Sequence, residues 1–211
     1  MIILQNEKIS AYSHGSLIPV MTAGAIILAV LAGKHLELQF FLSIYGISAI
    51  ILFTASYLYH ARKKSENERT VWRKLDRSAI FVLIAGTSTP MCFLYLHGTM
   101  MWVVLAVQWL AVLTGIAIVF FVNVPRKIST IVYLLIGIVC IMPIITNMMI
   151  IPPSVFGLFV AGGVSYIAGA VIYAVQKPNL HMGFHEIFHM FVIAGAVLHM
   201  LMIMRGVAIY I

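Results

Sequence analysis

Long apolar stretches separated by short polar gaps make up most of the chain. Two uncharged stretches run from Ser78 to Pro125 and from Ile128 to Gln176. Either would be about 72 Å long as one helix at 1.5 Å per residue, whereas the hydrocarbon core of a bilayer is about 30 Å thick. Each stretch is therefore predicted to fold back once. Polar and helix-breaking residues stand where the turns are needed, at positions 96–99 and 152–154.

Three further apolar runs, two near the N-terminus and one at the C-terminal end, are each close to the roughly 20 residues that cross a bilayer as a helix. The sequence thus predicts an all-α integral membrane protein, a seven-transmembrane-helix bundle that forms a single domain over residues 1–211. The predicted spans are residues 16–33, 38–60, 77–96, 100–122, 128–150, 154–175 and 183–204.

The composition excludes a water-soluble globular fold. Hydrophobic residues make up 63% of the chain and charged residues only 9%, whereas soluble domains carry about 25% charged residues. The net charge of +7 does not indicate nucleic-acid binding, because the Lys and Arg side chains lie in short gaps between apolar runs. We therefore expect membrane lipids, and no nucleic acid, as partners.

The distribution of Lys and Arg predicts the orientation, since basic residues flanking the spans are retained on the cytoplasmic side. With the N-terminus in the cytoplasm, only Lys34 and Arg205 of the thirteen basic residues lie outside. The predicted topology has a cytoplasmic N-terminus and an extracytoplasmic C-terminus.

Two other patterns indicate packing rather than chemistry. Ala161, Ser165 and Gly169 recur every four residues in the sixth span, and such a stripe of small residues lets helices approach closely. Cys92 and Cys140 both fall inside spans, without the spacing of a redox or metal motif, and are predicted to be inert thiols.

Ionisable side chains gather at one depth of the predicted bundle. His60 ends the second span, Asp76 precedes the third, and His185, Glu186 and His189 lie in the first two turns of the seventh. The predicted topology places all of them at the cytoplasmic end. Because ionisable groups inside a membrane are costly, such a group marks a candidate functional site.

A metal site is the chemistry that these residue types favour. His185 and His189 share one helix face, the usual spacing for two nitrogen ligands of one metal, and His60 can supply the third. Three protein ligands and a water form the usual catalytic zinc site, so Zn2+ is the predicted cofactor. Asp76 and Ser56 are the catalytic candidates: Asp76 to orient the water, and Ser56, one turn before His60, to hydrogen-bond within the cluster.

Two more histidines are predicted to be buried in the bundle without binding the metal. His199 lies about 15 Å further along the seventh helix than His189, and it is expected to line a polar cavity as a hydrogen-bonded side chain. His14 in the N-terminal region is interpreted in the same way.

Residues 185–189 also read as HExxH, the helical motif of zinc proteases in which the glutamate is the general base. An intramembrane protease that uses Glu186 in this way is therefore one hypothesis. The motif is short enough to arise by chance.

Longer blocks favour a different interpretation. Ser56 to His60, Leu75 to Pro90, and Gly183 to His189 running on to His199 resemble the hemolysin III branch of the progestin and adipoQ receptor family. The opening segment, with Asn6-Glu7 and Ser13-His14-Gly15, is also similar to that family. The likeness covers nearly the whole chain.

The resemblance implies a zinc ion held by His60, His185 and His189, with Asp76 near the metal-bound water. It also implies zinc-dependent hydrolysis of a lipid amide or ester, linked to membrane-lipid homeostasis, in a bacterial plasma membrane. Related receptors carry glutamine at the position of Glu186, which disfavours the protease. The alternative is a protein without turnover, either a zinc-containing membrane sensor or a pore-forming cytolysin, and the protease is the third hypothesis.

Overall fold

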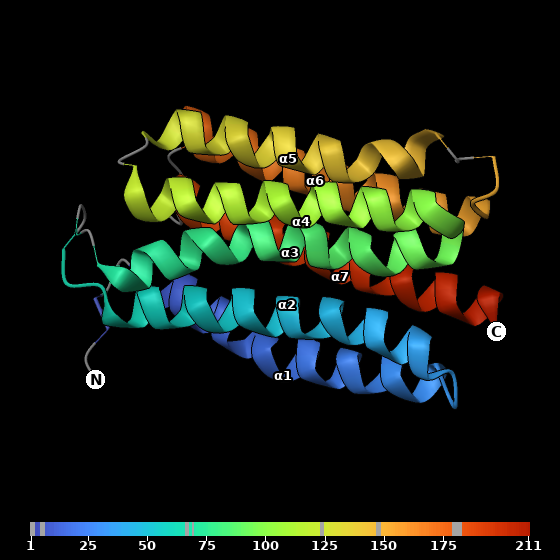
Figure 1. Cartoon of the computed structure of the whole chain (residues 1–211). Helices are drawn as coiled ribbons and strands as arrows, with labels where there is room; N and C mark the ends of the chain where they lie inside the picture. The colour runs from blue at the N-terminus through green and yellow to red at the C-terminus, as the bar shows by residue number, and fades with distance from the viewer. Residues whose placement is uncertain are drawn as a thin grey trace.

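The computed structural model describes residues 3–4, 7–65, 68, 70–122, 125–146, 149–178 and 183–211, and for residues 126, 127, 141–144 and 146 it describes the backbone only. Within these residues the chain forms seven helices and no strand. Successive helices run antiparallel, so the N-terminus and the C-terminus lie at opposite ends of the bundle (Figure 1). The helices are α1 (Lys8–Leu31), α2 (Leu36–Arg62), α3 (Val71–Tyr95), α4 (Gly98–Phe121), α5 (Arg126–Thr146), α6 (Pro153–Val175) and α7 (Gly183–Tyr210).

Six of the helices, all except α5, are long and apolar enough to cross a membrane. The described apolar part of α5, Ile128–Cys140, is shorter. The six helices agree with the prediction of an all-α membrane protein. The expected span 128–150 covers most of α5, which is described from Arg126 to Thr146. Residues 147–148 lie outside the described residues, and residues 149–150 form a turn.

Several helices extend beyond the predicted spans. The first helix begins at Lys8 rather than at residue 16, and the last continues to Tyr210 rather than ending at residue 204. The early turns of α1 are polar, yet Ser10 and His14 are buried there. A prediction from hydropathy underestimates the length of such a helix, because the polar side chains of its first turns face other helices instead of lipid.

The main core lies between α1, α2, α3 and α7 and includes buried side chains of α6. Phe53, Met91, Met202 and Ile203 are among its fully buried side chains. Smaller apolar clusters join α4 and α5 to α3. The two central helices, α3 and α7, therefore connect the α1–α2 pair to the remaining helices (Figure 1).

Small residues of α6 face α7, but the predicted stripe was wrong at its first member. Ala161 is exposed, and the neighbouring Gly162 is buried against α7 instead. Ser165 donates a hydrogen bond to the carbonyl of Phe191, 2.8 Å away, and Gly169 packs against the same residue. The stripe is thus Gly162, Ser165 and Gly169, which follows the 3.6-residue period more closely than a strict four-residue spacing.

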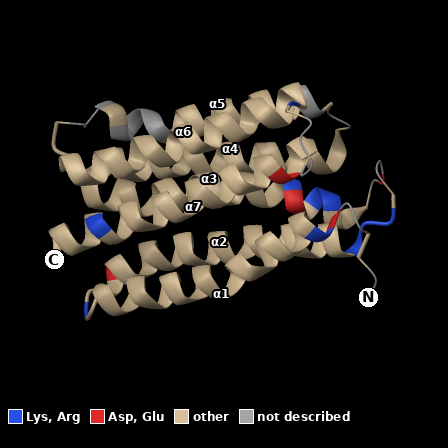
Figure 2. Cartoon of the chain, turned by 180° about the vertical axis from the view of Figure 1, so that it is seen from behind, with Lys and Arg blue, Asp and Glu red and all other residues tan. Residues whose placement is uncertain are grey.

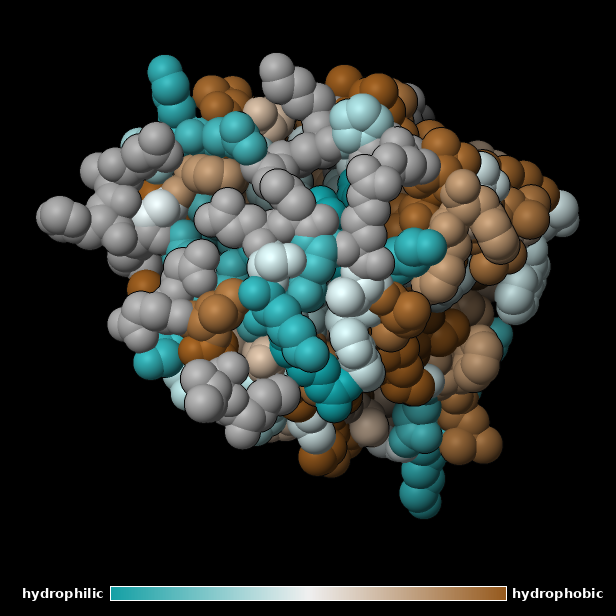
Figure 3. Space-filling view, turned by 90° about the vertical axis from the view of Figure 1, so that its left-hand side faces the viewer, coloured by the Kyte–Doolittle hydropathy of each residue, from teal (hydrophilic) through white to brown (hydrophobic). Residues whose placement is uncertain are grey.

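Charged residues are concentrated at the end of the bundle that carries the N-terminus (Figure 2). The space-filling view of this end shows hydrophilic side chains at several places on it, with most apolar residues toward one side (Figure 3). Lys34, between α1 and α2, Glu37, in the first turn of α2, and Arg205, near the end of α7, belong to the opposite end. This asymmetry agrees with the distribution of basic residues on which the predicted orientation depends.

Candidate metal centre

Three histidines from two distant segments meet at the N-terminal end of the bundle. His60 lies in the last turn of α2, and His185 and His189 lie in the first two turns of α7. One ring nitrogen of each residue lies within 4.8 Å of the corresponding nitrogens of the other two. His60 and His189 are buried, and His185 is half-buried. The structure thus brings together the three side chains that sequence analysis selected as a ligand set.

The two α7 histidines have the geometry of neighbouring ligands. Their Nε2 atoms lie 3.2 Å apart. Two zinc–nitrogen bonds of about 2.0–2.1 Å at a tetrahedral angle would place the two nitrogens about 3.3 Å apart. Imidazole nitrogens are also among the donors that zinc prefers. The residues present therefore fit a zinc ion, and a moderate approach of His60 would complete the set.

Ser56 and Asp76 lie beside this cluster. Asp76 is in the second turn of α3, and Ser56 is one turn before His60 on α2. The Ser56 hydroxyl hydrogen-bonds the Asp76 carboxyl, and Asp76 is close enough to His60 for electrostatic interaction. Both residues line the same cavity as His185 and His189. A carboxylate thus faces the space next to the candidate ligands.

Glu186 has a different environment. Its Oε2 atom lies over Gly183, where an added Cβ would come within 2.6 Å of it. The φ of Gly183 is +75°, a conformation that strains any L side chain. Glu186 is not among the cavity-lining residues, although both neighbouring ligand candidates are. The carboxylate of the HExxH motif therefore lies at the helix N-terminus, outside the cavity wall.

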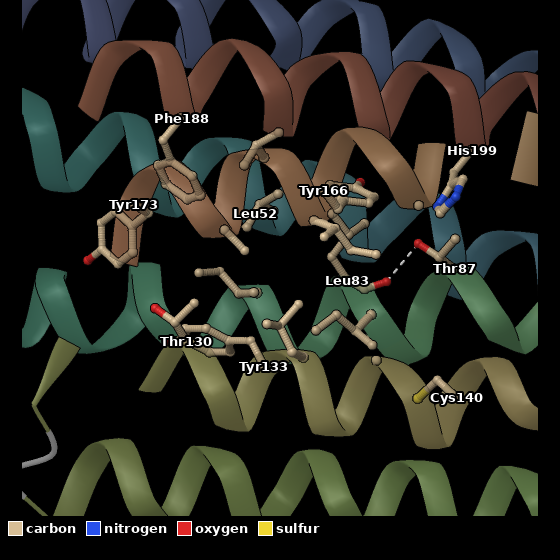
Figure 4. A pocket seen from close by; sticks show the side chains of 18 of the residues that line it. Leu52, Leu83, Thr87, Thr130, Tyr133, Cys140, Tyr166, Tyr173, Phe188 and His199 are labelled. Atoms are coloured by element: carbon tan, nitrogen blue, oxygen red, sulfur yellow. Dashed lines mark hydrogen bonds between the residues drawn. The ribbon is translucent and has the colours of Figure 1, made fainter. Parts of the chain in front are cut away.

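An elongated cavity of about 420 Å³ runs from the histidine cluster into the bundle. Figure 4 shows it between Tyr173 and Phe188 at one end and His199 and Cys140 at the other. Leu52, Leu83 and other aliphatic side chains cover most of the wall. The surface of the expected polar cavity is therefore mainly apolar, although polar side chains such as Thr87, Tyr133 and Tyr166 also line it.

His199 and His14 both line this cavity and both are buried. The Nε2 atom of His199 is 3.2 Å from the carbonyl oxygen of Phe159, so His199 is hydrogen-bonded, as predicted. For His14 the prediction of a hydrogen bond was wrong, because among the described residues neither of its ring nitrogens has a hydrogen-bond partner. Its ring packs instead against the ring of His189, with 4.0 Å between centroids. Neither residue belongs to the three-histidine cluster.

Sequence analysis missed one residue of the site, Glu7. This side chain is only 4% exposed, and its Oε2 atom is 2.6 Å from Nδ1 of His60. Burial alone would raise the pKa of Glu7, but hydrogen bonds and charge interactions with His60 and Lys63 outweigh burial and lower this pKa to about 2. The only sequence signal for a role of Glu7 was its place in the opening segment that resembles the family. Asn6, its neighbour in that segment, lies outside the described residues.

Comparison with known proteins agrees with the resemblance in the sequence. Residues 2–200 match the family described as "Haemolysin-III related". The protein named "Hemolysin-3" of Bacillus cereus is 33% identical over 199 residues, which cover 92% of this chain and 88% of that protein. The "Hemolysin-3 homolog" of Bacillus subtilis (strain 168) is 31% identical over 204 residues, 93% of this chain and 92% of that protein.

Proposed function

The chain belongs to the haemolysin III family of multi-pass membrane proteins, and on that premise we propose that it is a zinc-dependent hydrolase of a membrane-lipid amide or ester. The observation that supports this proposal is the arrangement of histidines, a carboxylate and a cavity at one end of the bundle. Three histidine nitrogens lie within 4.8 Å of one another, next to a carboxylate and at the end of an apolar cavity. Zinc is held by His60, His185 and His189.

The proposal includes the placement in the membrane. All seven helices cross the plasma membrane of a bacterial cell as one domain, with the N-terminus in the cytoplasm and the C-terminus outside. The concentration of Lys and Arg at the N-terminal end of the bundle supports this orientation. The candidate metal centre then lies near the cytoplasmic face.

The hydrolytic step uses groups that line the cavity. When bound, zinc polarises the scissile carbonyl and lowers the pKa of a water molecule. Asp76 accepts a proton from the attacking water and returns it to the departing amine or alkoxide, so that water and the lipid yield a carboxylic acid and an amine or alcohol. The hydrogen bond from Ser56 holds the Asp76 carboxylate in place during both transfers.

The shape and polarity of the cavity favour a lipid over a peptide. Its volume of about 420 Å³ is within the usual range for small-molecule sites. Its mainly apolar wall suits an acyl chain better than a polar peptide backbone. Glu186, the base that a protease would need, is not part of the cavity wall.

A second candidate function is cytolysis, which the names of the two Bacillus relatives suggest. In this case the histidine cluster would hold a stabilising metal ion and the protein would permeabilise a target membrane. The two functions differ in their dependence on Asp76. Release of a dye from lipid vesicles that persists in Asp76→Ala would support cytolysis, because a pore needs no proton-transfer group.

Zinc content of the detergent-purified protein tests the proposal directly. Native protein should carry nearly one zinc per chain, His185→Ala should lose it, and Asp76→Ala should keep it. Native protein should also hydrolyse ceramide-like or phospholipid substrates, and Asp76→Ala should lose that activity by about 10²–10⁴-fold. Native protein without zinc, or an Asp76→Ala variant with unchanged hydrolysis, would overturn the hydrolase.

A further inference from the structure

Glu7 is an acidic residue buried immediately before the first helix. Its side chain would ordinarily cap α1, because acidic groups at a helix N-terminus stabilise the unpaired N–H groups there. Glu7 occupies the N-cap position, but its side chain makes no capping hydrogen bond. It points instead to the last turn of α2, so helix capping does not explain why this carboxylate is buried.

Both carboxylate oxygens of Glu7 have partners at the C-terminal end of α2. Oε2 lies 2.6 Å from Nδ1 of His60, and Oε1 accepts a hydrogen bond from Nζ of Lys63. Lys63 is the residue after the end of α2, and its ammonium group also lies 5.8 Å from the ring centroid of Tyr59. A buried carboxylate needs such pairing to offset the cost of desolvation.

The hydrogen bond between Glu7 and His60 determines which ring nitrogen is available for a metal. An ionised carboxylate can only accept hydrogen bonds, so Nδ1 of His60 carries the proton and donates it to Glu7. In a neutral imidazole the other nitrogen, Nε2, then has a free lone pair. A metal needs this form of the ring, because a doubly protonated histidine cannot be a ligand.

We propose that Glu7 is a positioning residue of the metal centre, which fixes the tautomer and orientation of His60 so that its Nε2 atom faces His185 and His189. This inference rests on the proposed metal site. Carboxylates commonly accept the second N–H of a metal-bound histidine, and their loss lowers metal affinity by about 10–100-fold. Lys63 in turn holds the carboxylate, so the three groups form a chain from ammonium to imidazole.

The role extends to α1 as a whole. Seven residues after Glu7, on the same buried face of α1, the ring of His14 lies 4.0 Å from the ring of His189. Glu7 at the N-cap and His14 inside α1 therefore contact two of the three ligand candidates, one through a hydrogen bond and the other through ring packing. The N-terminal segment belongs to the metal centre although it contributes no ligand.

A purely structural role is the competing explanation. In that case Glu7 and Lys63 hold α1 against α2, and the contact between Glu7 and His60 has no effect on metal binding. The variants Glu7→Gln and Lys63→Met separate the two. Glu7→Gln keeps an oxygen that can accept the Nδ1 proton but removes the negative charge from His60. Lys63→Met breaks the ion pair and leaves the contact between Glu7 and His60 intact. Glu37→Gln is the matched control, because Glu37 is an exposed glutamate at the start of α2.

The measurement is zinc affinity of the full-length protein in detergent, by competition with a chromogenic chelator, together with thermal stability of the zinc-free protein. We expect Glu7→Gln to weaken zinc binding about 10–100-fold, Lys63→Met to weaken it clearly less, and Glu37→Gln to leave it unchanged. The visible spectrum of the Co2+-substituted protein should change in Glu7→Gln, because the orientation of one ligand changes.

Each outcome has a distinct meaning. Native affinity and an unchanged Co2+ spectrum in Glu7→Gln would overturn the positioning role and leave the metal site standing. Equal losses of affinity in Glu7→Gln and Lys63→Met, with equal falls in zinc-free stability, would support the structural role instead. Native protein that binds no zinc would overturn the metal site itself, and the role of Glu7 with it.

Discussion

His185 and His189 direct their Nε2 atoms at each other across one turn of α7, at a distance of 3.2 Å. Two neutral imidazoles come this close when one ring nitrogen donates a hydrogen bond to the other, or when both bind one cation. In either arrangement the positions of the two rings depend on the proton or the cation that they share. The stability of the N-terminal end of α7 should therefore respond to metal.

Removal of zinc should destabilise the native protein. A ligand that binds only the folded state at 100 times its Kd stabilises that state by about 2.7 kcal/mol. We expect the thermal unfolding midpoint of the detergent-purified protein to fall when a chelator is added and to recover with zinc. Tryptophan fluorescence can follow the transition. His185→Ala should unfold at one temperature under all three conditions, and a chelator response in this variant would contradict the ligand assignment.

Glu186→Gln should retain zinc and most of any lipid hydrolysis. Its carboxylate lies over Gly183 and is not part of the cavity wall, so we expect it to take no direct part in hydrolysis. The comparison is Asp76→Asn, which changes a cavity-lining carboxylate in the same way. In a zinc protease the order would be reversed, with Glu186→Gln losing about 10²–10⁴-fold in activity. Hydrolysis assays on both variants, normalised to zinc content, decide between the two.

Much of this arrangement follows from the sequence, because its causes are local. The lengths of the apolar runs limit how many helices the chain can form, and the Lys and Arg positions distinguish one end of the bundle from the other. The spacing of His185 and His189 places both rings on one helix face without any tertiary information. The alternating direction of successive helices then brings the end of α2 and the start of α7 to the same end of the bundle. His60 is therefore predicted to lie near the two α7 histidines.

Features that depend on docking between helices were not predictable in this way. The contact between Glu7 and His60 joins residues that are 53 positions apart and requires a specific rotation of α1 against α2. The same docking buries Ser10 and His14, so hydropathy alone places the start of α1 too late. The rotation of each helix also decides that Glu186 lies outside the cavity wall. It likewise decides that mainly apolar side chains line the cavity.

Gly162→Ala should destabilise the packing of α6 against α7. A Cβ atom at Gly162 would lie 2.3 Å from Cδ2 of His199, a ring that is buried and hydrogen-bonded to the carbonyl of Phe159. Overpacking of this kind costs about 1–3 kcal/mol. Gly157→Ala is the control, because a Cβ at this exposed position of α6 meets no atom within 4 Å. Thermal unfolding should show a lower midpoint in the first variant and no loss in the second.

Gly163→Leu should block the cavity without disturbing the metal centre. Gly163 lines the cavity, and a Cβ there has no neighbour within 4 Å, so a leucine side chain can extend into the space proposed for the acyl chain. We expect hydrolysis of long-chain substrates to fall about tenfold or more, while zinc content and the thermal midpoint stay near native values. Gly157→Leu places the same side chain on an exposed face of α6 and should have no effect on hydrolysis. If Gly163→Leu hydrolyses long-chain and short-chain substrates as the native protein does, the acyl chain must bind elsewhere.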